Sequence, residues 1–286
     1  MMYTTIRTEL DKGVFSIILC RPEAYNTITP ELANDLGTAI DEADADEKTR
    51  VILLRSEGPA FCAGYGLDWS TKAQAAESDQ TRIWDSIADY QMMSGFVNVY
   101  QKLWYASKPS IAAVQGWCIC GGTDLVLWSD IIIASETSVF GYPTSRLWGV
   151  PTTAMWVYRI GFEKAKRYLL TGDEIPGPKA AEIGLILETV PDDKLQDYAM
   201  AMARRMALLP LNQLQMIKLY CNQIAENMGI QSQKTLGILF DGVARHTQEG
   251  LDFVKKANEI GFRAVVRRRD EPFGDYGSGP RAKKKK

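Results

Sequence analysis

The stretch that most constrains this chain is KPSIAAVQGWCICGG, which runs from residue 108 to residue 122. Residues 110–114 are apolar, rich in β-favouring side chains and bounded by a proline and a glycine, which predicts a buried strand. Gly121 and Gly122 then lead into a second apolar run, residues 125–128, which we predict to be a helix. A glycine turn at a helix start leaves backbone N–H groups unpaired at the positive end of the helix dipole. Such a corner suits a developing negative charge.

Three interpretations fit these glycines to different degrees. The spacing of Gly116, Gly121 and Gly122 has the outline of a P-loop, but Gly122 stands where that loop requires lysine. Nucleoside triphosphate chemistry is therefore disfavoured. An oxyanion hole for a carbonyl fits the residues better. The remaining alternative is that the glycines only allow strand and helix to pack closely.

Composition narrows the class of protein. The chain has 286 residues, of which 46% are hydrophobic, enough for one sizeable domain with or without a smaller appendage. The formal net charge of −2 includes five cations, Arg281 and the lysines at 283–286, so residues 1–280 carry a net charge of −7. Because a Gly, Ser and Pro-rich stretch precedes these cations, we predict a solvated tail. Binding of nucleic acid or a membrane by this tail is the alternative that we rank last.

The five cysteines are scattered, and no secretory segment precedes the first predicted strand. We therefore predict a reduced, cytoplasmic setting. Cys118 and Cys120 form a C-x-C pair, but the chain has one histidine, so the usual ligand sets of zinc are missing and we expect no metal site. No apolar run approaches the roughly twenty residues that cross a bilayer.

Strands and helices alternate over the first two thirds of the sequence, which predicts an α/β architecture with a largely parallel sheet. Thr29 and Pro30 are typical of a helix cap and first turn, and the apolar residues that follow recur at helical spacing. From residue 193 the pattern is helical, with predicted helices at 194–209, 211–228, 231–246 and 248–268. We therefore divide the chain into an α/β core at 1–192, a helical region at 193–270 and a flexible basic tail at 271–286. Broad apolar faces on the late helices predict an oligomer.

Seven segments, in this order and spacing, resemble the crotonase (enoyl-CoA hydratase/isomerase) superfamily over nearly the whole chain. They are RPEAYNTI at 21–28, FCAGYGL at 61–67, KPSIAAVQGWCICGGTDL at 108–125, SDIIIAS at 129–135, FGYP at 140–143, LLTGDEI at 169–175 and AAEIGLI at 180–186. The resemblance implies a spiral core of ββα repeats and a C-terminal helical region that forms trimers or dimers of trimers. It also implies an acyl-CoA thioester as the ligand, with coenzyme A as part of the substrate and no further cofactor.

The resemblance assigns roles to residues. Tyr65 and Gly121 are expected to donate their backbone N–H groups to the thioester oxygen, and Asp124 is expected to be the acid/base. Coenzyme A is expected along two loops, through Glu23, Ala24, Tyr25, Ala63, Gly64, Gly66 and Leu67. Lys255, or its neighbour Lys256, stands where the family reaches a phosphate of coenzyme A, commonly across a subunit boundary; a solvated helical face is the alternative.

The chain departs from the hydratase pattern at two positions. The hydratases carry glutamate where this chain has Asp124 and again where it has Thr144. The first change keeps a carboxylate, but the second removes an ionisable group, because a threonine hydroxyl does not titrate in the working range. Tyr142, Arg146 and Trp148 lie in the same loop and suggest a specialised acyl pocket; packing of the loop is the alternative.

We therefore expect an enoyl-CoA hydratase, a lyase of fatty-acid or related lipid catabolism, with Tyr65, Gly121, Asp124 and Thr144 at its centre. One alternative is another enolate reaction, such as C–C bond hydrolysis or a lyase step on a bulky or cyclic acyl group. A second is an acyl-CoA binding protein of low activity, because the second glutamate is absent. Residues 281–286 motivate the third, nucleic-acid binding.

Overall fold

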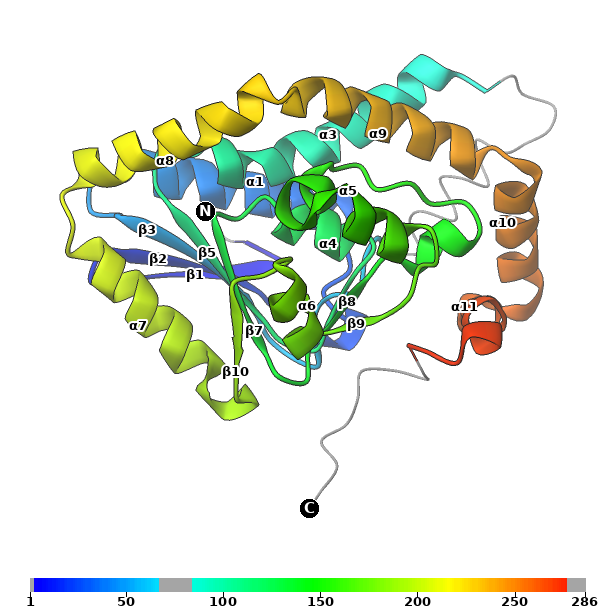
Figure 1. The fold of residues 1–286 in the computed structure, drawn as a ribbon, viewed down its shortest axis with the longest axis horizontal. Coiled ribbons are helices and arrows are strands. Elements are labelled where there is room, and N and C mark those ends of the chain that lie inside the picture. The colour runs from blue at the N-terminus through cyan, green and yellow to red at the C-terminus, as the bar shows by residue number, and fades with distance from the viewer. Residues whose placement is uncertain (1–2, 67–83, 277–286) are drawn as a thin grey trace.

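The computed structural model describes residues 3–66 and 84–276, which form two β-sheets with helices packed around them (Figure 1). The larger sheet has the strand order β1-β2-β3-β5-β7-β10. Its strands are β1 (Ile6–Asp11), β2 (Val14–Leu19), β3 (Val51–Ser56), β5 (Ser110–Val114), β7 (Ile131–Ser135) and β10 (Glu188–Val190). β1 and β2 form an antiparallel hairpin, and each later pair of neighbours is parallel. The predicted α/β architecture with a largely parallel sheet is confirmed.

The smaller sheet has the order β4-β6-β8-β9. Its strands are β4 (Ala60–Cys62), β6 (Trp117–Ile119), β8 (Val139–Gly141) and β9 (Ile175–Pro176). Along the chain, a strand of the large sheet is followed by a strand of the small sheet and then by a helix, in the units β3-β4-α3, β5-β6-α4 and β7-β8-α5. This is the expected spiral of ββα repeats. β4 and β6 were not predicted as strands, because three residues are too few to show a period of two.

Helices cover both faces of the large sheet. The first five described are α1 (Pro30–Ala45), α3 (Ser86–Tyr105), α4 (Gly121–Val126), α5 (Met155–Leu169) and α6 (Gly177–Ile183). The predicted cap of α1 is confirmed, because the Thr29 hydroxyl accepts a hydrogen bond from the backbone N–H of Leu32 at 3.2 Å. The helix predicted at 125–128 begins earlier, at Gly121, so the paired glycines belong to its first turn.

The inner parallel strands β2, β3, β5 and β7 are buried on both faces, which explains their nearly continuous apolar runs. In β3, Ile52 and Leu54 join the main core, whereas Val51 and Leu53 belong to a second core on the opposite face. The second core is closed by α7 (Leu195–Ala207), the first helix of the predicted C-terminal region. That region therefore starts with a helix that covers the sheet; the domain boundary at residue 193 stays a prediction.

Four further helices follow α7: α8 (Leu211–Asn227), α9 (Ile230–Arg245), α10 (Gln248–Ile260) and α11 (Phe262–Asp270). Figure 1 shows α8 and α9 as an arm that crosses above α1 and α3, and α9 packs against α3. The prediction of one helix over 248–268 was wrong. Gly261 has φ +84°, a left-handed conformation that ends α10 and turns the chain into α11.

Residues 271–276 correct the prediction of a flexible tail starting at residue 271. After the short 3₁₀ helix Glu271–Phe273, Tyr276 is buried, and its hydroxyl donates a hydrogen bond to the carbonyl of Gly172 at 2.9 Å. The remainder of the predicted tail, 277–286, lies outside the described residues.

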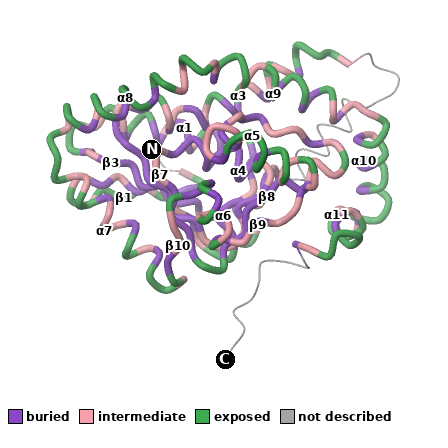
Figure 2. Tube along the Cα trace, in the orientation of Figure 1, coloured by how far each residue is buried: buried purple, intermediate pink, exposed green. Residues whose placement is uncertain are grey.

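The outer surfaces of α8 and α9 are exposed (Figure 2) and carry large apolar side chains. These are Met216, Ile217, Leu219, Tyr220, Ile224, Leu236, Leu239, Phe240 and Val243. Such a surface is typical of a subunit interface, and the oligomer stays a prediction. Within the part of the chain that the structure describes, no helix has the length and apolarity to span a membrane.

Candidate functional site

The loop before α1 is fixed by a buried asparagine that sequence analysis did not single out. Asn26 is 1% exposed, and its amide nitrogen donates to the carbonyls of Glu57 and Ala60 at 2.8 and 2.9 Å. Its amide oxygen accepts from the backbone N–H of Arg21 at 2.8 Å. Tyr25 and Asn26 adopt φ values of +52° and +50°, and asparagine tolerates this conformation better than most residues. The loop is therefore held in one shape against the start of β4.

Backbone hydrogen bonds then align residues 63–66 with this loop. The N–H of Ala63 donates to Tyr25, the N–H of Ile28 donates to Gly64, and the N–H of Gly66 donates to Ile28. Tyr65 thus forms a parallel bridge with Ile28, a pattern in which the N–H of Tyr65 points away from its partner strand. Among the described residues, no acceptor is found for that N–H.

The second backbone donor lies beside the first. Gly121 opens α4, so its N–H has no acceptor within the helix, and none is found elsewhere among the described residues. A Cβ on Gly64 would lie 3.5 Å from the Gly121 nitrogen, which shows that the loop at 63–66 reaches the start of α4. The structure therefore places the loop that carries Tyr65 beside Gly121; that the two N–H groups bind one thioester oxygen stays a prediction.

The glycines at this corner are required for different reasons. A Cβ on Gly121 would lie 2.8 Å from the ring of Tyr65, and a Cβ on Gly122 would overlap the carbonyl oxygen of Cys62. Gly122 therefore fits the packing alternative, whereas Gly121 presents its N–H. Cys120, just before the helix, has φ +51° and ψ −124°, a strained conformation for a residue with a side chain.

Asp124 lies three residues after Gly121 and is fully buried. Its Oδ2 atom is 3.3 Å from the hydroxyl of Tyr142, whereas its Oδ1 atom has no hydrogen-bond partner among the described residues. Burial, and secondarily the negative charge of Asp241, raise the pKa of Asp124 to about 8, while Thr152 and Tyr142 partly oppose this shift. A carboxyl group that titrates near neutrality can accept and return a proton during a reaction.

Three charged residues that the sequence did not indicate form a buried cluster. Asp241 and Arg245 lie one turn apart on α9, and Arg245 Nε is 3.0 Å from Asp241 Oδ2. Arg245 also binds Asp89 of α3, with Nη2 at 2.7 Å from Oδ1. All three side chains are buried. The i,i+4 spacing of Asp241 and Arg245 is typical of an ion pair on a helix surface. The sequence near these residues therefore did not indicate that they are buried.

The loop after β8 carries four of the predicted site residues, and one of them, Tyr142, reaches Asp124. Tyr142 is buried, and its hydroxyl donates to the carbonyl of Val150 at 3.0 Å as well as facing Asp124. Trp148 packs against Phe253 of α10, with ring centroids 5.5 Å apart. Thr144 is partly buried, and a Cβ on Gly149 would overlap its hydroxyl oxygen. The packing alternative therefore describes Trp148.

Arg146 does not face Asp124. Its side chain is 2% exposed and binds Asp270 at 2.9 Å and Asp275 at 2.6 Å. Its guanidinium also lies 3.9 Å from the ring centre of Phe273. Arg146 thus fastens residues 270–275 to the loop, and the prediction that it lines an acyl pocket is replaced by the packing alternative.

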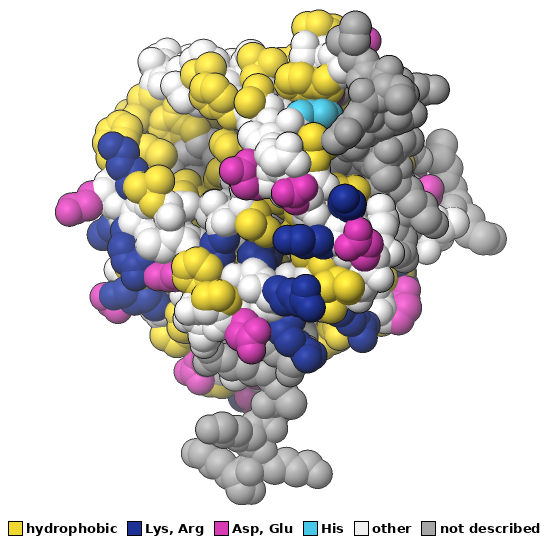
Figure 3. All heavy atoms as spheres, turned by 90° about the vertical axis from the view of Figure 1, so that its right-hand side faces the viewer, with side chains coloured by type: hydrophobic (Ala, Val, Ile, Leu, Met, Phe, Trp, Pro, Cys, Tyr) yellow, Lys and Arg dark blue, Asp and Glu magenta, His cyan; other side chains and the backbone are white. Residues whose placement is uncertain are grey.

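The predicted coenzyme A residues occupy two neighbouring loops. Glu23 and Ala24 form part of the 3₁₀ helix Pro22–Ala24, with Glu23 exposed. Ala63 and Gly66 are bonded to residues 25 and 28 as described, and Leu67 lies outside the described residues. Lys255 is exposed on α10. The side of the molecule that carries α10 and α11 gathers many Lys and Arg side chains (Figure 3).

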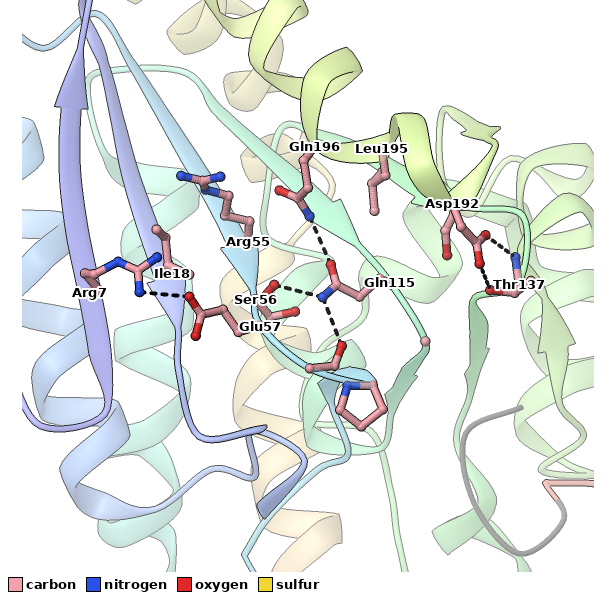
Figure 4. Close-up of a pocket in the computed structure, with 14 residues that line it drawn as sticks. Arg7, Ile18, Arg55, Ser56, Glu57, Gln115, Thr137, Asp192, Leu195 and Gln196 are labelled. Atoms are coloured by element: carbon pink, nitrogen blue, oxygen red, sulfur yellow. Dashed lines mark hydrogen bonds and ion pairs between the residues drawn. The ribbon is translucent and has the colours of Figure 1, made fainter. Parts of the chain in front are cut away.

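A cavity of about 590 Å³ lies away from these residues (Figure 4). It opens at the carboxyl ends of β3 and β5, and α7 forms part of its wall. Its two arginines, Arg7 and Arg55, already pair with Glu57 and Glu9, both at 2.8 Å. None of Tyr65, Gly121 and Asp124 lines it, so this cavity is not part of the candidate site.

Comparison with known proteins places the chain in a family. The family model for enoyl-CoA hydratase/isomerase matches residues 9–259. The chain belongs to the enoyl-CoA hydratase/isomerase family. The predicted membership of the crotonase superfamily is thus confirmed, and the two backbone donors described above lie within the matched region of this family member.

Similar proteins cover most of the chain. A crystal structure of an enoyl-CoA hydratase from Mycobacterium smegmatis is 41% identical, covers 97% of both chains and superimposes with a TM-score of 0.92. A probable enoyl-CoA hydratase of Rhizobium meliloti is 31% identical over 79% of this chain and 84% of its own length. A hydroxycinnamoyl-CoA hydratase-lyase of Pseudomonas fluorescens is 28% identical over 71% of this chain and 73% of its own length. The crotonase-like fold of this family member is therefore confirmed.

Proposed function

We propose that this crotonase-type enzyme is an enoyl-CoA hydratase, which adds water across the double bond of a 2-enoyl-CoA thioester. The observation that carries the proposal is that Tyr65 and Gly121 lie side by side and that their backbone N–H groups have no acceptor among the described residues. A buried carboxyl group, Asp124, follows the second donor by one turn of helix. Two donors for an oxyanion and one acid/base are the groups that the reaction requires.

The donors act on the thioester carbonyl. When water attacks C3, the electron pair of the C2–C3 double bond moves to form an enolate, and negative charge develops on the thioester oxygen. Fixed donors bind this charge more strongly than they bind the ground-state carbonyl, and each contributes about 3–4 kcal/mol in comparable sites. Because both donors are backbone groups, their positions depend on the loop and helix rather than on side-chain rotamers.

Asp124 serves both proton transfers. The ionised carboxylate takes a proton from the attacking water as the oxygen bonds to C3. It then returns this proton to C2 as the enolate collapses and the carbonyl reforms. One water molecule is added, and Asp124 ends in the ionised state in which it began. A pKa of about 8 makes this carboxylate a stronger base than an exposed aspartate near neutral pH.

The surrounding features support the rest of the proposal. Coenzyme A binds along the loops at residues 23–25 and 63–67, and Lys255, which is exposed on α10, binds one of its phosphates. The substrate brings coenzyme A with it, and the reaction uses no further cofactor. The exposed apolar surface of α8 and α9 supports a trimer or a dimer of trimers. We place the enzyme in the cytoplasm, in the catabolism of fatty acids or related lipids.

A lyase step on a bulky acyl-CoA is the second candidate. It is favoured by Thr144, which stands where the hydratases carry a second glutamate, and by similarity to the hydroxycinnamoyl-CoA hydratase-lyase. Such a step also passes through a thioester enolate, so it uses the same two donors. In this step the 3-hydroxyl group of a 3-hydroxyacyl thioester loses its proton, the C2–C3 bond breaks, and C3 leaves as a carbonyl carbon. The enolate left at C2 then takes up a proton.

Turnover of crotonyl-CoA and of longer and aromatic enoyl-CoA thioesters tests the proposal. We expect loss of the enoyl absorbance with at least one of them, and we expect Asp124→Asn to remove this activity. Asp252→Asn, at an exposed position of α10, is the matched control and is expected to leave it unchanged. Tight coenzyme A binding without turnover of any thioester would refute the proposal and favour a binding protein.

A further inference from the structure

The arm formed by α9 brings a charged side chain to the reaction centre. Two glycines allow the close approach. A Cβ on Gly237 would lie 2.8 Å from the carbonyl oxygen of Pro151, and a Cβ on Gly242 would overlap Asp89 Oδ2. Glycine weakens a helix interior by about 1 kcal/mol relative to alanine. Glycine at these two positions therefore allows α9 to contact the loop at 150–152 and α3, although it makes the helix itself less stable.

The side chains that α9 buries on this face include charged ones, which are rarely buried in protein interiors. Arg245 lies between two carboxylates, those of Asp241 and Asp89, so the buried group carries more negative than positive charge when all three are ionised. Burying charges is costly, and apolar residues of similar size often give equal or greater stability. Stability alone does not account for these three residues.

Asp241 is connected to Asp124 through one short segment of backbone. α9 contacts the backbone next to Val150, because a Cβ on Gly237, one turn before Asp241, would lie 2.8 Å from the carbonyl oxygen of Pro151. The carbonyl of Val150 accepts from the Tyr142 hydroxyl at 3.0 Å, and this hydroxyl lies 3.3 Å from Asp124. The loop at 142–150 therefore transmits the position of α9 to the acid/base.

We propose that the Arg245-held carboxylate of Asp241 is the second acidic group of this reaction centre and positions the proton of Asp124, in place of the glutamate that position 144 lacks. The inference rests on the proposed function and names the residue that tunes its acid/base. Asp241 is a positioning residue, because it acts through Asp124 and the Tyr142 loop. Burial raises the pKa of Asp241 itself, and the guanidinium of Arg245 opposes this rise. Ionised Asp241 disfavours a second negative charge on Asp124 and so makes that carboxylate a stronger base.

Several other groups face Asp124 and do not replace Asp241 in this role. They are Tyr65 from the loop after β4, Tyr100 from α3, Cys118 and Cys120 from the β6–α4 connection, Tyr142 and Thr152 from the β8–α5 connection, and Arg245 beyond Asp241 on α9. Burial raises the pKa values of the tyrosines and cysteines further above neutrality, so these groups stay uncharged. Asp241 contributes the largest effect of a neighbouring charge on Asp124.

Asp241→Asn in the full chain tests this inference. The variant keeps the shape of the side chain, and Arg245 keeps its partner Asp89. Difference infrared spectroscopy between pH 5 and pH 10 follows the Asp124 carboxyl directly, and Asp124→Asn identifies its band. We expect the midpoint to fall by about one pH unit or more in Asp241→Asn. The matched control, Asp252→Asn, is expected to leave the midpoint in place.

The pH dependence of kcat provides the second measurement. In the unaltered protein kcat is expected to rise with pH through about 8, as Asp124 ionises. In Asp241→Asn the rise is expected at lower pH, and the plateau is expected to fall by about threefold or more, because Asp124 is a weaker base. Asp241→Glu is expected to restore part of both changes.

Two results would overturn the inference. One is an unchanged Asp124 midpoint in Asp241→Asn. The other is a kcat that falls by the same factor at every pH, which is what a purely structural residue would give. Failure of the proposed function is seen differently, as absence of turnover in the unaltered protein, and the infrared titration still reports on Asp241 in that case.

Discussion

Replacing Asn26 by alanine tests how the site is held in shape. The side chain makes three hydrogen bonds with the backbone of residues 21, 57 and 60. At about 1 kcal/mol each, these contribute about 3 kcal/mol. Alanine at φ +50° adds about 1 kcal/mol of strain. We therefore expect Asn26→Ala to lower the free energy of unfolding by about 3–5 kcal/mol, and to lower turnover because residues 63–66 are aligned on this loop.

Urea unfolding at pH 7, with activity measured on the same samples, checks this expectation. Asn26→Gly removes the same hydrogen bonds without the strain, so it is expected to be more stable than Asn26→Ala by about 1 kcal/mol. Asn34→Ala, at an exposed position of α1, is the matched control and is expected to leave stability within about 0.5 kcal/mol. A loss below about 1 kcal/mol in Asn26→Ala, or a glycine variant as stable as the unaltered protein, would refute the reasoning.

Three further predictions concern the buried groups. Asp124→Asn is expected to stabilise the protein increasingly as pH rises. The folded state raises the pKa of Asp124 to about 8, so the proton bound by Asp124 stabilises the folded state fully below the pKa that Asp124 has in the unfolded chain. This stabilisation is lost as pH rises through about 8. The difference in unfolding free energy between variant and unaltered protein should grow by about 3 kcal/mol from pH 5 to pH 8, and a constant difference would contradict the prediction. Gly122→Ala is expected to destabilise by about 1–3 kcal/mol and to lower kcat, because its Cβ meets the backbone of Cys62; thermal unfolding and kinetics measure this, and an unchanged melting temperature would count against it. Arg146→Ala removes the ion pair of Asp275, whereas Asp270 keeps Arg269 at 2.7 Å. The variant is expected to cost about 3 kcal/mol, with new proteolytic cleavage near residues 270–276. Resistance equal to that of the unaltered protein would show that this contact does not hold the segment.

Features with a local signature could be predicted from the sequence. The Thr29 cap, the apolar strand at 110–114 and the glycine corner all lie within short stretches, and the structure has them there. Asp124 was predicted from the resemblance to the hydratases, which carry a glutamate at this position. The three-residue strands β4 and β6 were missed because they are shorter than one readable period.

The groups that depend on distant parts of the chain could not be predicted. Asp241 reaches Asp124 only because α9 crosses α3, and nothing near residue 241 in the sequence indicates that crossing. Arg146 was assigned to an acyl pocket from its neighbours in the loop, whereas its partners are Asp270 and Asp275. In both cases a charge finds its partner through tertiary packing, which has no signature in local periodicity.

The attachment of residues 270–276 to the Arg146 loop has a consequence for protein synthesis. The loop that carries Tyr142 is translated midway, yet its fastening arrives only when residue 276 has left the ribosome. A nascent chain arrested before that point lacks the contacts of Asp275 and Tyr276. A chain truncated near residue 265 is therefore expected to be synthesised but to have no enzymatic activity. A synthetic peptide that spans the missing turns is expected to restore this activity.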